Sequence, residues 1–255
     1  MAVLVTGAGR RIGRAMALHL ARHGYDVAVH YSESQSEALD TVDEIRSMGR
    51  RAEAVRANLL DETEAESLVS KAVAAVGPLT ILVNNASIFE EDTLASATFS
   101  SWNRHFGSNL RAPFVLIQNF SLQIPKNDDN NDPIPKGMII NIIDQRVNKL
   151  TPQFMTYTLA KSALWILTKT AAQALAPNIR VNAIGPGPTL KGIRQSEDNF
   201  CRQRAATILG RGAHTEDITA ALDYLIKAHA VTGQLICPDG GQHLAWQTPD
   251  VMDVE

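Results

Sequence analysis

Three ionisable residues near the middle of the chain have the types and spacing of a proton-transfer site. Tyr157 and Lys161 lie four residues apart in a good helix-forming context, so both side chains project from one helical face. A free tyrosine has a pKa of about 10, and a neighbouring cation favours its phenolate. Asp144 adds a carboxyl group directly after an apolar strand. The three residues predict general acid–base chemistry, although such a Tyr–Lys pair also arises by chance and Asp144 could be a simple cap.

The segments that must position these residues alternate between strand and helix. Apolar, β-branched runs predict strands over 2–6, 27–31, 51–56, 80–83, 138–143, 179–184 and 234–237. Helices are expected over 14–23, 34–48, 61–76, 101–122, 154–176 and 216–229, with a short helix near 198–209. This alternation predicts an α/β fold, a single-domain Rossmann-type doubly wound parallel sheet of about seven strands with helices on both faces. Ligands bind such a sheet at the carboxyl ends of its strands.

Two stretches interrupt the alternation, and we expect both to be loops within one domain that spans residues 1–255. Segment 126–136 is rich in Asn, Asp and Pro, which predicts an exposed loop. Segment 188–213 is irregular and follows the sixth strand, where a lid would close over a substrate. Strand–helix alternation resumes after each stretch, so neither is a domain linker.

The composition is that of a globular enzyme or binding protein. Of 255 residues, 45% are hydrophobic and 20% are charged, and the net charge of −3 gives no electrostatic case for nucleic acid or membrane binding. No run approaches the roughly 20 apolar residues of a membrane span. A strand begins at Ala2, which leaves no room for a signal peptide. We therefore expect a cytoplasmic protein.

Neither the cysteines nor the histidines form a recognisable ligand motif. Cys201 and Cys237 are far apart in the sequence, and we interpret them as incidental thiols of a protein in a reducing compartment. His19, His23 and His30 are spread over a helix and a strand, and we expect them to be structural. No metal site is therefore expected from the sequence.

The turn from Thr6 to Gly13 predicts a nucleotide-binding site. It lies between the first strand and the first helix, where glycines let the backbone approach a pyrophosphate and the helix N-terminus favours its charge. A tight turn without a ligand is the alternative, because a glycine motif alone is weak evidence. Arg10 and Arg11 beside the turn suit an additional phosphate, although they could also be solvated residues at a helix start. NADPH is the expected cofactor.

The end of the second strand also favours NADP over NAD. An NAD site usually has an acidic residue there to hold the ribose diol, whereas this chain has His30, Tyr31 and Ser32, with Glu33 one residue later. Short polar residues follow the third and fourth strands, where they could contact the cofactor or merely satisfy turn backbone. The cofactor-binding residues predicted in these turns are Gly7, Arg10, Arg11, Ile12, Gly13, His30, Tyr31, Ser32, Asn58, Leu59, Asn85 and Ala86.

Together and in this order, the motifs resemble the short-chain dehydrogenase/reductase family from Val3 to Leu244. The resemblance rests on the Thr6–Gly13 turn, Asn84-Asn85-Ala86, Asn109, Tyr157-x-x-x-Lys161, Pro186-Gly187 and Asp239-Gly240-Gly241. It implies that Tyr157 donates a proton and that Lys161 binds the nicotinamide ribose and lowers the tyrosine pKa. It further implies that Pro186 and Gly187 contact the cofactor. It also implies that Asn109 holds a water in a proton relay, although on composition alone Asn109 could simply face solvent.

Departures from the usual family pattern resemble the pteridine reductase branch. Arg11 and Ser87 each stand where the family usually has Gly, and Asp144 stands where it usually has Ser. Phe89 matches the aromatic residue that sandwiches a pterin against nicotinamide in that branch, whereas Glu33 replaces a basic residue often seen there. The resemblance implies a substrate site made of Arg11, Ser87, Phe89, Asp144 and Tyr157. A carboxyl group can also pass a proton to a C=N bond, which pterins contain.

The sequence therefore predicts an NADPH-dependent reductase of a pterin such as a dihydropterin, dihydrofolate or dihydromonapterin. One alternative is a general carbonyl reductase for a 3-oxoacyl thioester or a sugar ketone. Another is a cofactor-binding sensor without turnover, against which the Tyr157–Lys161 pair argues. The family is usually tetrameric, which implies a homotetramer built through the long helices after the fourth and fifth strands. The Ala-rich segment 160–176 could instead pack against its own sheet.

Overall fold

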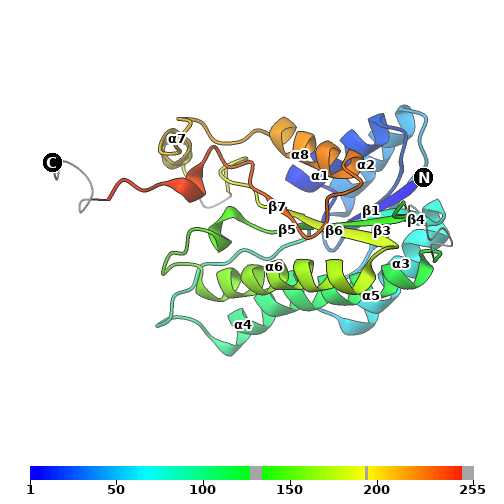
Figure 1. Cartoon of the computed structure of the whole chain (residues 1–255), viewed down its shortest axis with the longest axis horizontal. Helices are drawn as coiled ribbons and strands as arrows, with labels where there is room; N and C mark the ends of the chain where they lie inside the picture. The colour runs from blue at the N-terminus through cyan, green and yellow to red at the C-terminus, as the bar shows by residue number, and fades with distance from the viewer. Residues whose placement is uncertain (127–133, 193–194, 249–255) are drawn as a thin grey trace.

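A seven-stranded parallel sheet forms the centre of the protein, in the order β3-β2-β1-β4-β5-β6-β7 (Figure 1). The computed structural model describes residues 1–126, 134–192 and 195–248. The strands are β1 (Ala2–Val5), β2 (Asp26–Tyr31), β3 (Ala52–Arg56), β4 (Leu79–Asn84), β5 (Gly137–Ile142), β6 (Ile179–Ile184) and β7 (Leu235–Ile236). The strand order reverses between β1 and β4, and such a reversal opens a ligand crevice at the carboxyl ends. The predicted fold class is confirmed.

Helices cover both faces of the sheet (Figure 1). One face carries α1 (Arg11–Arg22), α2 (Gln35–Ser47) and α8 (Thr215–Lys227). The other carries α3 (Glu62–Val76), α5 (Ala112–Gln123) and α6 (Met155–Leu175). Two shorter helices, α4 (Phe99–Phe106) and α7 (Glu197–Ala205), lie in the connections that follow β4 and β6.

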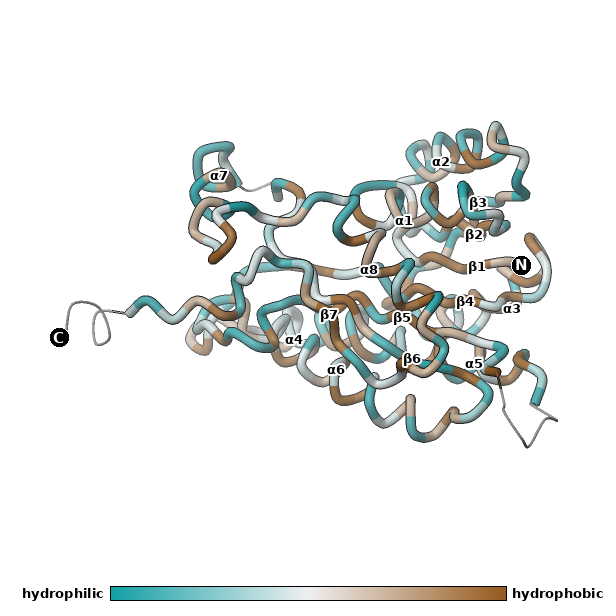
Figure 2. The backbone as a smooth tube through the Cα atoms, turned by 45° about the horizontal axis from the view of Figure 1, so that its top comes forward, coloured by the Kyte–Doolittle hydropathy of each residue, from teal (hydrophilic) through white to brown (hydrophobic). Residues whose placement is uncertain are grey.

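The central strands β1, β4 and β5 are mostly apolar because each face of the sheet has its own core. In β1, Val3 and Val5 pack beneath α1 and α8, whereas Leu4 packs on the opposite side beneath α3 and α5. Figure 2 shows mainly hydrophobic residues along the central strands, whereas hydrophobic and hydrophilic residues are mixed along the helices. A parallel sheet that is buried on both faces needs continuous apolar runs rather than alternation. This is why the strands were readily predicted from the sequence.

The single helix predicted over 101–122 is three consecutive pieces. Thr98 caps α4 by a reciprocal pair of hydrogen bonds with Ser101, and α4 then leads through a π-helical turn, η1 (Gly107–Arg111), into α5. Asn109 lies in this turn with its side chain fully buried. The alternative in which Asn109 faces solvent is therefore wrong, because the wider turn directs the residue inward.

Other boundaries differ by a few residues from those predicted. Helix α1 begins at Arg11 rather than at residue 14, and α7 ends at Ala205 rather than at residue 209. Residues 127–133 of the predicted exposed loop and residues 193–194 of the predicted lid lie outside the described residues. Among the helices that are described, none has the length and apolar character needed to cross a membrane.

Candidate active site

The three predicted proton-transfer residues meet where β5 ends and α6 begins. The Tyr157 hydroxyl, in the first turn of α6, donates a hydrogen bond to Oδ2 of Asp144 at 3.0 Å. Lys161 lies one turn farther along α6, and its Nζ donates to the backbone oxygen of Ile142 at 2.8 Å. Tyr157 and Lys161 are buried, and Asp144 is half-buried. The arrangement places one phenol and one carboxyl group in direct contact at the carboxyl edge of the sheet.

Burial is the largest influence on the pKa values of Tyr157, Asp144 and Lys161. It raises the pKa of Tyr157 well above its ordinary value, and the Asp144 carboxylate raises it further. Burial also raises the pKa of Asp144 and lowers that of Lys161 to about 8. Lys161 Nζ lies 5.8 Å from the centroid of the Tyr157 ring, and the lowering of the tyrosine pKa that the resemblance implies for Lys161 stays a prediction. The ammonium is directed at the Ile142 carbonyl, so Tyr157 is a protonated donor whose acceptor is Asp144.

The turn between β1 and α1 fits the phosphates of a dinucleotide. Gly7 has a φ of +62°, and a Cβ at Gly13 would lie 2.2 Å from the Gly7 carbonyl oxygen, so a larger side chain would fill the turn. Arg10, the N-cap of α1, makes no side-chain capping bond within the described structure. The first N–H groups of the helix are therefore available to an anion.

The turns after β1 and β4 are joined to each other. Thr6 Oγ1 accepts hydrogen bonds from the backbone N–H groups of Asn85 and Ala86 at 2.8 and 2.9 Å. The Asn85 amide donates to the backbone oxygen of Thr6 at 2.8 Å. Asn85 and Ala86 were predicted to bind cofactor, and the structure shows that the Asn85 side chain holds the two turns together.

His30 supports the glycine turn, the segment Thr6–Gly13 that runs from β1 into α1, and both of its ring nitrogens bind backbone groups. Its Nδ1 accepts a hydrogen bond from the backbone N–H of Gly7 at 3.0 Å, and its Nε2 donates to the backbone oxygen of Ala57 at 3.0 Å. The ring is 1% exposed, and burial lowers its pKa to about 4, so it is neutral with the proton on Nε2. We predicted that His30 contacts the cofactor, and this is corrected because both ring nitrogens bind backbone groups.

Arg11 connects the glycine turn to the predicted lid. Its guanidinium donates to the backbone oxygens of Lys191 and Leu190 at 2.7 and 2.9 Å. Its backbone has a φ of 56°, an unusual conformation for a residue other than glycine. We expected Arg11 to contact a cofactor phosphate and the substrate. In the structure its side chain lies instead on two carbonyls of the lid, and both Arg10 and Arg11 are exposed.

The remaining predicted cofactor residues line the same edge of the sheet. Ile12 lies in the first turn of α1, and Tyr31 and Ser32 lie at the end of β2. The others follow β3 or β6 and are Asn58, Leu59, Pro186 and Gly187. The backbone N–H of Asn58 donates to Glu64 at 2.7 Å, which fixes the turn after β3. A Cβ at Gly187 would lie 2.5 Å from Cβ of Asp239, so only glycine allows this close approach.

Aromatic rings flank the Tyr157 hydroxyl. The Phe89 ring lies parallel to Phe154 with centroids 4.3 Å apart, and it meets Tyr157 edge to face at 4.7 Å. The Arg146 guanidinium lies 5.0 Å from the centroid of Phe154. Phe89 is 46% exposed, and Ser87, on the same loop, is exposed as well. The sequence predicted Phe89 and Ser87 but missed Phe154 and Arg146, although both lie between Asp144 and Tyr157.

The loop that carries Ser87 and Phe89 is anchored at two points. In the first, Asn109 from the π-helical turn binds both backbone groups of Ile88, at 2.9 Å each. Its amide is therefore occupied by the loop, and the water relay implied for Asn109 stays a prediction. In the second, Asp92 accepts hydrogen bonds from the backbone N–H and the hydroxyl of Thr156, at 3.1 and 2.5 Å.

His105 completes this second anchor. Its Nε2 accepts a hydrogen bond from the backbone N–H of Glu90 at 3.1 Å, so Nδ1 carries the proton and donates to Thr156 Oγ1 at 2.6 Å. The ring is fully buried, and burial lowers its pKa, which favours this neutral form. Because Thr156 directly precedes Tyr157, one buried network fixes both the loop and the catalytic residue. The sequence offered no signal for it, since its members have no distinctive spacing.

The fold and this site together define a class of protein, the Rossmann-type dehydrogenases and reductases that carry a catalytic tyrosine. Residues 1–201 match the short chain dehydrogenase family, and the chain belongs to that family. The resemblance predicted from the sequence is thereby confirmed.

Individual relatives span almost the whole chain. The 3-oxoacyl-[acyl-carrier-protein] reductase FabG of Staphylococcus aureus is 33% identical over 94% of this chain and 97% of its own. The crystal structure of FolM alternative dihydrofolate reductase 1 from Brucella suis, in complex with NADP, is 44% identical, with a TM-score of 0.91 over 98% of this chain and 97% of its own. The Brucella canis protein of the same name, also complexed with NADP, is 43% identical, with a TM-score of 0.90 over 99% and 98%.

Proposed function

We propose that the protein is an NADPH-dependent reductase of pterin-type substrates, such as a dihydropterin, dihydrofolate or dihydromonapterin. The observation that carries this proposal is the 3.0 Å hydrogen bond from Tyr157 to Asp144, with the exposed part of the Phe89 ring beside it. A carboxyl and phenol pair suits protonation of a ring nitrogen, and an aromatic face suits a flat heterocycle. The similarity to two proteins named alternative dihydrofolate reductases supports the same substrate class.

The cofactor proposal rests on the glycine turn and on the NADP held by these neighbours. Gly7 and Gly13 leave room for a pyrophosphate, and the uncapped start of α1 provides N–H donors for it. Lys161, buried one turn from Tyr157, would hold the nicotinamide ribose. NADPH, when bound, supplies the hydride. Arg10 and Arg11 add positive charge beside the turn, which favours an additional phosphate.

Reduction of a C=N bond adds a hydride to carbon and a proton to nitrogen, and the chain must deliver the proton. Tyr157 holds a proton at neutral pH because burial and Asp144 raise its pKa. Asp144 also has a raised pKa, so it can carry a proton itself or return one to the phenol. Lys161 neutralises the negative charge that remains after transfer. Phe154, supported by Arg146, holds the Phe89 ring in place.

A general short-chain carbonyl reductase is the second candidate. It is favoured by the 33% identity to a 3-oxoacyl-[acyl-carrier-protein] reductase over 94% of this chain. In that reaction the oxygen of a ketone receives the proton, so the carboxyl group of Asp144 would have no special use.

The test is NADPH oxidation with a panel of quinonoid, dihydro and fully oxidised pterins, run beside an acetoacetyl thioester and a sugar ketone. We expect the highest kcat/KM for a dihydropterin and a lower value when NADH replaces NADPH. A correctly folded protein that prefers the thioester would favour the second candidate. Binding of NADPH without reduction of any substrate would instead revive the sensor alternative.

We also propose that the enzyme assembles as a homotetramer and works in the cytoplasm. The observation that supports the assembly is an apolar groove of about 750 Å³ along α4, η1 and α5, which includes Phe106 and the half-exposed Phe114. A second copy of the chain would cover this groove. Light scattering should give four times the chain mass of 27.7 kDa, and Phe114→Glu should reduce it. A wild-type monomer would contradict this assembly.

A further inference from the structure

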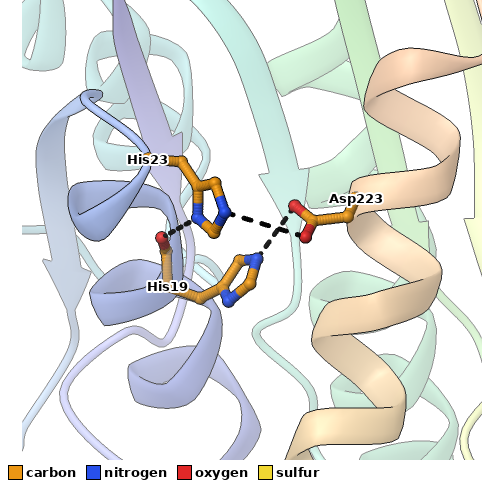
Figure 3. Close-up of side chains that lie close together, drawn as sticks. All are labelled: His19, His23 and Asp223. Carbon is orange, nitrogen blue, oxygen red and sulfur yellow. Dashed lines mark hydrogen bonds and ion pairs between the residues drawn. The ribbon is translucent and has the colours of Figure 1, made fainter.

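A cluster of three metal-ligating side chains lies between α1 and α8. His19 lies in the last turn of α1, His23 is the C-cap residue of that helix, and Asp223 faces both from α8 (Figure 3). His19 Nε2 lies 2.9 Å from Asp223 Oδ1, and His23 Nε2 lies 3.9 Å from Asp223 Oδ2. One ligand atom from each residue falls within 4.8 Å of the other two.

The orientation of His23 matches that of a metal ligand. Its Nδ1 lies 2.9 Å from the backbone oxygen of His19 and must donate, because a carbonyl can only accept. In the neutral ring the lone pair is therefore on Nε2, which faces the carboxylate of Asp223. A lone pair that faces a carboxylate repels it, and either a proton on Nε2 or a bound cation removes that repulsion. Histidines that bind metals commonly donate their other ring N–H to a carbonyl in this way.

Two protonated imidazoles would satisfy the carboxylate less well than one metal ion. The rings of His19 and His23 have centroids 4.3 Å apart, so two positive charges on them would repel each other. Arg22, on the same helix, is paired with Glu44 at 3.8 Å. A single divalent ion would let both rings remain neutral while it balances the carboxylate.

We propose that His19, His23 and Asp223 bind one divalent transition-metal ion of the Zn²⁺, Co²⁺ or Ni²⁺ type, with water completing the coordination. Two imidazoles and one carboxylate suit these ions better than Mg²⁺ or Ca²⁺, which prefer oxygen ligands. Donors about 2.1 Å from a tetrahedral Zn²⁺ are about 3.4 Å apart. The separations of 2.9 Å to Oδ1 and 3.9 Å to Oδ2 of Asp223 lie on either side of that value.

The site would link two elements that border the proposed active site. Helix α1 begins at the glycine turn, and α8 follows the predicted lid. An ion that binds the folded protein alone stabilises it by mass action. We expected His19 and His23 to be structural and expected no metal site. The third ligand comes from a residue 204 positions away from His19, which sequence spacing cannot show.

The test uses the full-length chain, stripped of metal with a chelator and then dialysed against Co²⁺ or Zn²⁺. We expect one ion per chain, a visible Co²⁺ spectrum typical of nitrogen and oxygen ligands, and a Tm that rises with Zn²⁺. Each of these should be lost in His19→Gln and in Asp223→Asn. His229→Gln is the matched control, because it removes an exposed imidazole outside the cluster, and it should bind like the wild type.

Two results would overturn the proposal. One is uptake well below one ion per chain in the wild type, which would mean that the cluster consists only of two ion pairs between the histidines and Asp223. The other is uptake that persists in both ligand variants, which would place the ion elsewhere. If His19→Gln does not fold, as judged by circular dichroism, His23→Gln replaces it. The His23 side chain is 46% exposed, so its loss should be tolerated, and it should bind metal at least tenfold more weakly than His229→Gln.

Discussion

The Tyr157 hydroxyl donates a hydrogen bond to Asp144 Oδ2 at 3.0 Å, whereas the Lys161 ammonium donates one to the backbone oxygen of Ile142. The tyrosine is therefore paired with an acid rather than with the cation one turn away. Asp144 raises the pKa of Tyr157 in addition to the effect of burial. The chemistry of the site should accordingly respond most strongly to changes at Asp144.

Asp144→Ser should separate the two candidate reactions. A serine donates only a neutral hydrogen bond, so turnover of a dihydropterin should fall by about 100-fold or more, the usual contribution of a general acid. Reduction of an acetoacetyl thioester should be unchanged or faster, because a ketone needs only that neutral hydrogen bond. Steady-state kinetics with both substrates measure the difference. Undiminished pterin turnover in the variant would argue against a catalytic role for the carboxyl group.

Phe89→Ala should weaken binding of a pterin without weakening binding of NADPH. The Phe89 ring is half-exposed and meets Tyr157 edge to face, and loss of this stacking surface should raise KM about tenfold, equivalent to about 1.4 kcal/mol. Leu94→Ala, in the same connection and 84% exposed, is the control and should have little effect. Equal KM values for the two variants would show that Phe89 is not a substrate contact.

Thr156→Val should destabilise the protein, whereas Thr158→Val should not. Removal of the Thr156 hydroxyl takes one of two hydrogen bonds from Asp92, which keeps the backbone N–H of residue 156, and it leaves the His105 N–H without its buried acceptor. An unsatisfied buried group costs about 1–3 kcal/mol. Thr158 is equally buried, and its hydroxyl has no hydrogen-bond partner among the described residues. Urea unfolding measures both variants.

If Thr156→Val only lowered stability, the protein that stays folded would keep the wild-type kinetics. Because the network also positions the Phe89 loop, we expect KM for the pterin to rise in Thr156→Val. Thr158→Val should keep the wild-type KM. If both variants lose the same stability, the anchoring role of this network is refuted.

His30 should make the free energy of unfolding depend on pH. Its pKa is lowered from 6.5 to about 4 by burial, so the unfolded chain binds a proton that the folded chain does not. The stability due to neutral His30 is complete above pH 6.5 and is lost as pH falls toward about 4, a change on the order of 3 kcal/mol. Urea unfolding across this range should show a shallower pH dependence for His30→Gln. His229→Gln, which alters an exposed histidine, should keep the wild-type slope.

The sequence predicted most of the fold because local patterns determine it. Strand β5 is buried on both faces, and its run of isoleucines was recognisable without any partner. The same holds for the helical spacing of Tyr157 and Lys161. The boundary at Arg11 was missed because its backbone takes a left-handed conformation, which propensity does not predict for arginine.

The sequence could not predict features that depend on contacts between distant segments. Asp92 and Thr156 are 64 residues apart, and His105 and Thr156 are 51 apart, so their network exists only in the folded chain. The orientation of Lys161 depends on a strand carbonyl, and the role of His30 depends on the backbone of Gly7. In each case an ordinary polar residue acquires its role from an unrelated part of the sequence.

The π-helical turn at Gly107–Arg111 sets the relative phase of the helices on either side of it. One residue added to a regular helix rotates everything after it by about 100°. The turn therefore lets Asn109 face Ile88 while Leu116 and Phe120, farther along, still face the sheet. A deletion of one residue here would give a more regular helix but would bring one of these two sets out of register. In this stretch, length is constrained more tightly than residue identity.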